Sequence, residues 1–149
     1  MKTTKSFLTY FAAMLLLLSI YSQAQQGTSV MELLMRHTWV LPNSELLEIS
    51  YTDRTITITL RAGVSPATSV FYYYLSETPD TLFQPHKIGT ATKGRFINRI
   101  YEVAFRDNLL NKLSVIEILE LNENELNIEA ILKTPVVGGG AVRYVPKPR

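Results

Sequence analysis

Thr55-Ile56-Thr57-Ile58-Thr59-Leu60 is the stretch that decides the fold, because its polar and apolar side chains alternate without interruption. In a β-strand, alternate side chains point to opposite faces, so the two isoleucines and the leucine share one face and the three threonines share the other. This pattern is typical of an antiparallel strand with one buried side. A second segment repeats it, with Leu126, Ile128, Ala130 and Leu132 on one face and Asn127 and Glu129 on the other.

Other segments rich in aromatic or β-branched residues flank these two strands, at 38–41, 46–51, 69–76, 95–105, 112–121 and 141–145. Glycine, proline, asparagine and aspartate separate them at short, regular intervals, as in a sandwich or a barrel. Because no helices intervene, an antiparallel meander is expected, and closing it removes the exposed edge strands. The prediction is an all-β domain over residues 25–149, a meander closed into a barrel of seven or eight strands.

The N-terminal segment has the three parts of a secretory signal peptide: Lys2 and Lys5, an apolar run over 7–20, and Ser22-Gln23-Ala24. We expect cleavage after Ala24, so that residues 1–24 are removed. A permanent membrane anchor is the alternative, but the uninterrupted apolar core at 12–18 is shorter than the roughly 20 residues that span a bilayer. Since the chain has no cysteine, no lipid anchor at the cleavage site and no disulfide is possible. The expected product is soluble and exported, either periplasmic or extracellular.

The charge balance argues against a nucleic-acid partner. The chain has 15 basic and 13 acidic residues, and the two lysines of the signal segment account for the difference. A neutral domain lacks the electrostatic footprint of a protein that binds nucleic acid or an anionic membrane. Arg143, Lys147 and Arg149, near the C-terminus, are expected to be solvated charges.

A short helix is predicted to precede the first strand. Ser29 and Glu32 have the spacing of a capping box, in which each side chain bonds the backbone amide of the other residue. Val30, Leu33, Leu34 and His37 follow at helical spacing and predict one apolar face. A helix of about two turns is marginal alone, so this face is expected to pack on the β-structure.

The short helix, Trp39 at the start of the first strand, the meander and Arg143 on the last strand together resemble the lipocalin-like (calycin) superfamily, in particular its small secreted bacterial members. The resemblance implies an eight-stranded barrel that often holds one small apolar ligand. It also implies that Trp39 closes one end of the barrel while Arg143 stacks over its indole. His37 departs from the family pattern, which has glycine two residues before the tryptophan.

The aromatic run Phe71-Tyr72-Tyr73-Tyr74 is the most unusual feature of the domain. Phe71 and Tyr73 are expected to face one way, and Tyr72 and Tyr74 the other. One pair would line the barrel interior, and the other would lie beneath a helix or an external loop. The residues predicted to line a ligand pocket are Ile56, Ile58, Phe71, Tyr73 and Tyr101. The alternative is that these side chains only fill the core.

Catalytic residues are not evident. His37 and His86 stand outside any catalytic or metal-binding motif, so no catalytic residue, metal or cofactor is predicted. His37 or His86 beside a carboxylate in a concave site would be needed for an enzyme. Glu117 and Glu120 would be polar anchors if they pointed inward, but the outward orientation is expected.

Two further features have alternative interpretations. Arg95 and Arg99 share one face of a predicted strand, close to Lys93, and are either a solvated surface or a site for an anionic ligand. Gly138-Gly139-Gly140 lacks the residues of a phosphate loop and is expected to form a flexible hairpin.

These patterns favour an exported, non-enzymatic, lipocalin-like protein that binds a small hydrophobic or amphipathic molecule in the cell envelope. The alternative is a secreted inhibitor or protein–protein interaction module, for which an exposed apolar patch at Leu82-Phe83 would be evidence. The sequence leaves the oligomeric state open.

Overall fold

The computed structural model describes residues 28–131 and 140–148. The strands are β1 (Trp39–Leu41), β2 (Ser44–Tyr51), β3 (Thr55–Leu60), β4 (Ala67–Ser76), β5 (Phe96–Tyr101), β6 (Ser114–Asn122), β7 (Glu125–Ile131) and β8 (Val142–Pro146). The helices are α2 (Val30–Arg36) and α3 (Glu102–Arg106), with 3-10 turns η1 (Pro85–Lys87) and η2 (Leu110–Lys112). The predicted signal peptide, Leu132, Gly138, Gly139 and Arg149 lie outside the described residues.

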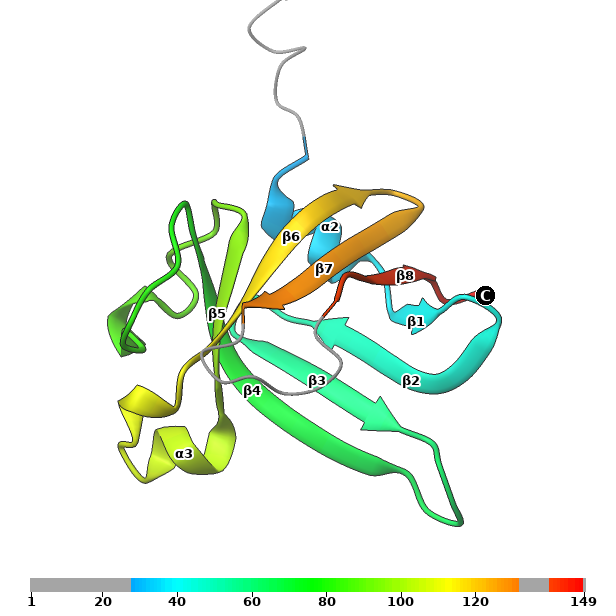
Figure 1. Cartoon of the computed structure of the whole chain (residues 1–149), viewed down its shortest axis with the longest axis horizontal. Helices are drawn as coiled ribbons and strands as arrows, with labels where there is room; N and C mark the ends of the chain where they lie inside the picture. The colour runs from blue at the N-terminus through cyan, green and yellow to red at the C-terminus, as the bar shows by residue number, and fades with distance from the viewer. Residues whose placement is uncertain (1–27, 132–139, 149) are drawn as a thin grey trace, which may run out of the picture.

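The strands form a closed antiparallel barrel. Each strand pairs with the next one in sequence, and β8 pairs with β1 (Figure 1). The all-β meander and its closure are therefore confirmed, with eight strands. The alternating stretch that suggested the fold is strand β3, with the predicted bounds. Its isoleucines face the interior, and Ile56 is almost fully buried.

Strand β5 is shorter than the predicted strand at 95–105. It ends at Tyr101, and the chain then turns into α3. The first half of β4, before Phe71, pairs with β3 but not with β5, so the residues after Tyr101 have no strand partner there. The helical turn instead lets Phe105 pack on Tyr72, with ring centroids 4.6 Å apart.

Helix α2 packs against the barrel at the end where β1 begins. The predicted capping box is present: the Glu32 amide donates to Ser29 Oγ, and the Ser29 amide donates to the Glu32 carboxylate. The predicted apolar face is only partly correct, because Met31 and Leu34 are the buried residues. A helical side chain leans toward the preceding turn, which brings Met31 over the interior. Among the described residues, no helix has the length and apolar character needed to cross a bilayer.

The barrel has two apolar cores. The interior core gathers residues from α2 and the strands, with Trp39, Tyr73, Ile97 and Leu126 fully buried. A second core lies on the outer face of β4 and β5, where the segment 77–95, α3 and η2 cover it. It contains Tyr74, Phe83, Ile88, Ile100, Leu113 and Val115. In Figure 1 this covering layer lies on one side of the barrel, away from the projecting β3–β4 hairpin.

Candidate functional site

The five residues predicted to line a pocket come together on the interior side of three adjacent strands. Ile56 on β3 is opposite Phe71 on β4, and Phe71 is opposite Tyr101 on β5. Ile58 and Tyr73 are two residues along their strands from Ile56 and Phe71, so they share that side. The structure thus places all five on one continuous patch.

Exposure increases along this patch away from α2. Tyr73 and Ile56 are buried, and Ile58 and Phe71 are partly buried. Tyr101 is 42% exposed although it is on the interior side of β5. We use the term exposed end for the end of the barrel opposite α2, where the interior-side residues Leu60, Tyr101 and Val142 keep 44%, 42% and 39% of their surface exposed.

The aromatic run alternates as predicted. Phe71 and Tyr73 belong to the interior core, whereas Tyr72 and Tyr74 belong to the outer core beneath the segment 77–95 and α3. Tyr74 contacts Phe83, and its hydroxyl donates to Asp80 Oδ2 at 2.7 Å. The outer pair therefore attaches the covering layer and has no part in the interior patch.

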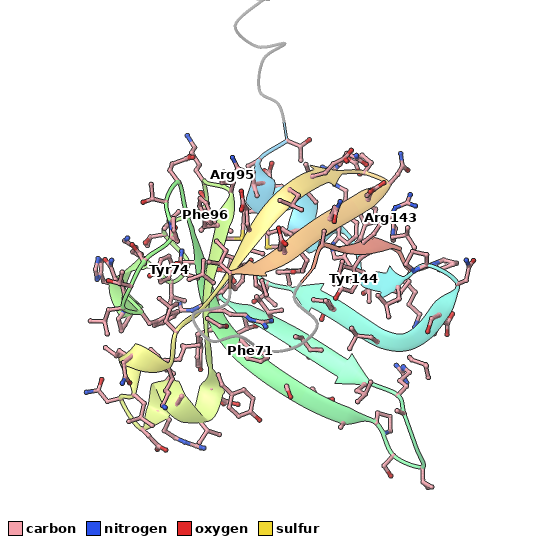
Figure 2. All side chains as sticks on the ribbon, in the orientation of Figure 1. Phe71, Tyr74, Arg95, Phe96, Arg143 and Tyr144 are labelled. Carbon is pink, nitrogen blue, oxygen red and sulfur yellow. The ribbon has the colours of Figure 1, made fainter. Side chains whose placement is uncertain are left out.

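Arg99 belongs to the interior patch and was missed as a pocket residue. On β5 it is opposite Tyr73 and Ser114, two residues before Tyr101. Its guanidinium lies 4.5 Å from the centroid of the Phe71 ring, and Phe71 is labelled in Figure 2. The sequence held a signal for this position, since residues 99 and 101 of one strand must share a face.

The expected proximity of Arg95 and Arg99 does not occur. Arg95 precedes β5, and its guanidinium pairs with Glu117 on β6 while its side chain stays 57% exposed. Arg99 is partly buried and makes no ion pair among the described residues. The interpretation of these arginines as solvated surface charges therefore fits Arg95 but not Arg99.

Burial controls the electrostatics of the patch. Desolvation lowers the pKa of the Arg99 guanidinium, while the nearby phenol groups of Tyr51 and Tyr144 favour its charged form. Desolvation also raises the pKa of both phenols, and the charge of Arg99 opposes that rise. At neutral pH the patch therefore combines one cation with two neutral phenols.

Trp39 and Arg143 lie in different environments, one buried and the other exposed. Trp39 is fully buried near α2, and its indole Nε1 donates to the Leu34 carbonyl oxygen at 3.0 Å. Arg143 is 59% exposed and pairs with Glu125 at 3.0 Å. Among the described residues, the cation–π contacts do not include the expected stacking of Arg143 over Trp39. Tyr144 takes the inward position on β8, so its neighbour Arg143 points outward (Figure 2).

The two histidines lie in separate elements, at the end of α2 and in η1. His37 Nε2 lies 3.2 Å from Glu123 Oε2, but that carboxylate is half exposed and also pairs with Arg36. His86 is exposed in η1. Glu120 is exposed, and Glu117 is taken up by Arg95, in agreement with the outward orientation. The described residues contain no group of three or more His, Cys, Asp or Glu side chains that could hold a metal ion.

Three surface pockets lined by described residues lie outside the interior patch. One of about 360 Å³ lies between α2 and β6 and includes Val30, Arg95 and Leu121. Another of about 410 Å³ lies beside β1 and includes Val40, Asn43 and Val145. Neither includes a residue of the predicted lining.

Comparisons of the chain with family models, with curated proteins and with solved structures find no match. The functional argument therefore rests on the geometry of this chain.

Proposed function

We propose that this protein is an exported, non-enzymatic, lipocalin-like barrel that binds a small amphipathic molecule through its exposed end. The observation that carries the proposal is the graded exposure of the interior patch. Apolar side chains that point into the barrel, among them Leu60, Tyr101 and Val142, remain accessible at one end, while α2 and Trp39 occupy the other. An apolar surface with a few polar groups is the usual composition of a small-molecule site.

Export is supported by the arrangement of Lys2, Lys5 and the apolar run before Ala24. When the full chain is expressed in a bacterial host, the intact mass of the protein recovered outside the cytoplasm should correspond to a chain that starts at Gln25. A mass that still includes residues 1–24 would contradict this part of the proposal.

Two leucines of similar exposure provide a matched test of ligand binding. Leu60 on β3 is on the interior side and 44% exposed, whereas Leu46 on β2 is on the outer side and 56% exposed. The neutral fluorescent probe N-phenyl-1-naphthylamine is titrated into the unaltered protein, Leu60→Ala and Leu46→Ala. Loss of apolar contact should weaken the affinity of Leu60→Ala about fivefold, equivalent to about 1 kcal/mol, and leave Leu46→Ala unchanged.

The proposal fails if the unaltered protein does not bind the probe, or if the two substitutions have the same effect. Circular dichroism of both variants verifies that the barrel is intact. The alternative, a secreted inhibitor or interaction module, gains no support at Leu82-Phe83: Phe83 is 1% exposed and belongs to the outer core, so only Leu82 reaches the surface.

A further inference from the structure

Arg99 differs from three arginines that also lie on or next to strands, and, unlike Arg54, which likewise makes no ion pair among the described residues, it is not exposed. Arg61, Arg95 and Arg143 each pair with a glutamate, whereas Arg99 pairs with no carboxylate among the described residues. The segments 1–27, 132–139 and 149 contain no aspartate or glutamate. No acidic side chain of this chain therefore neutralises the Arg99 guanidinium, although its burial makes an unpaired charge costly.

The guanidinium is held in one orientation. Its Nε donates to Ser114 Oγ at 3.1 Å, and its face lies over the Phe71 ring, 4.5 Å from the centroid. The Ser114 hydrogen bond restrains the Nε edge of the guanidinium, and the Phe71 ring restrains one of its faces. The two terminal nitrogens are left without an acceptor among the described residues. A fixed, planar pair of N–H donors matches the two oxygens of a carboxylate.

Two phenols add donors on other strands. Tyr51 on β2 and Tyr144 on β8 are both 6% exposed and belong to the interior core. The Tyr51 ring lies 5.7 Å from the ring of Tyr73, the residue opposite Arg99, and both phenols interact electrostatically with Arg99. Neither hydroxyl has a hydrogen-bond partner among the described residues. By contrast, the Tyr73 hydroxyl donates to the Thr52 carbonyl oxygen at 2.7 Å. Among the described residues, the fully buried side-chain atom without a hydrogen-bond partner is Asn127 Oδ1 and not either of these hydroxyls, so both phenols are available as donors to a ligand oxygen.

We propose that Arg99, Tyr51 and Tyr144 form a subsite for the carboxylate of an anionic amphiphile, whose apolar part lies against Phe71 and Tyr101 toward the exposed end. This inference rests on the proposed function and specifies its ligand class. A single carboxylate matches the one unpaired cation, whereas a dianion would leave a buried excess of negative charge. The phenols supply donors without adding charge.

Two probes that differ only in the head group test the subsite. Dodecanoate and dodecan-1-ol are titrated into the purified protein at pH 7.5 by isothermal titration calorimetry. Charge-assisted hydrogen bonds should make dodecanoate bind about 10 to 100 times more tightly than the alcohol. Arg99→Gln should abolish this preference, and Arg99→Lys, which keeps the charge but loses the planar fork, should reduce it. Arg143→Gln, a change at a surface arginine, should preserve it.

Each outcome supports or overturns the inference. Equal affinity for the acid and the alcohol would remove the subsite while leaving the proposed function in place. Absence of binding by either probe would remove both. A preference for dodecanoate that survives in folded Arg99→Gln would show that Arg99 does not bind the head group. If Arg99→Gln does not fold, the two probes on the unaltered protein and on Arg99→Lys decide the matter.

Discussion

Gly94→Ala is expected to be among the most damaging single-methyl changes in the barrel. Gly94 is buried just before β5, with φ of +121°, a region that residues with a side chain rarely adopt. A Cβ atom there would overlap the carbonyl group of Ser76 and lie 2.7 Å from the Glu77 amide nitrogen. These are backbone atoms at the end of β4, so no side-chain rotation can relieve the overlap.

Gly63 supplies the matched control, because it has φ of +110° and nothing within 4 Å of the added carbon. Gly63→Ala should cost only the backbone strain, about 1–2 kcal/mol. Gly94→Ala adds the displacement of packed backbone, about 1–3 kcal/mol more. The expected total of roughly 2–5 kcal/mol is a large fraction of the roughly 5–15 kcal/mol that stabilises a typical domain.

Urea denaturation measures the difference, with the fluorescence of the single tryptophan as the signal, since Trp39 is fully buried when folded. In thermal unfolding of the same variants, the melting temperature should fall by roughly 10–20 °C for Gly94→Ala and roughly 5 °C for Gly63→Ala. Equal losses in the two variants would refute the reasoning. They would mean that residue 94 can move away from Ser76. The close contact between the Gly94 and Ser76 backbones would then not be needed to hold β5 in register with β4.

Two further predictions concern polar side chains that have hydrogen-bond partners. Asn98 is fully buried, and its side chain accepts from the Asp80 amide (3.0 Å) and donates to Ser76 Oγ (2.6 Å). Asn98→Ala should therefore lower the free energy of unfolding by about 2–4 kcal/mol. A loss below about 1 kcal/mol in urea denaturation would contradict this role. Hydrogen bonds from Arg61 and Lys147 lower the pKa of the Glu48 carboxyl from 4.5 to about 2. The contribution of the Glu48 carboxylate to stability is therefore complete above pH 4.5 and is lost as the pH falls to about 2. The unfolding free energies of the unaltered protein and Glu48→Gln should thus differ at pH 6 and converge near pH 2, and a constant difference would exclude this titration.

The predictions that succeeded depend on local periodicity. The alternation in Thr55–Leu60 assigned the inner and outer faces of β3 correctly, and the same rule separated Phe71 and Tyr73 from Tyr72 and Tyr74. The capping box was likewise readable, because Ser29 and Glu32 need only three residues of spacing. Such features form whenever the local backbone adopts its preferred conformation.

The predictions that failed depended on contacts between distant segments. The predicted helix face included Leu34 and Val30 correctly but missed Met31, because the position of α2 over the barrel, and not its period alone, buries Met31. Phe105 left the predicted strand because the turn into α3 packs its ring on Tyr72 and Phe83 in the outer core. Arg143 was expected over Trp39, but the register of β8 turns Tyr144 inward.

By itself, the sequence determined an all-β meander of seven or eight strands and the inward and outward sides of its alternating strands. Only the tertiary structure decided which charges find partners. Arg95 and Arg99 look alike in sequence, yet one meets Glu117 and the other lies inside the barrel with Tyr51 and Tyr144. The physical reason is that periodicity is a property of one strand, whereas the surroundings of a side chain depend on strands far apart in sequence that meet only when the barrel closes.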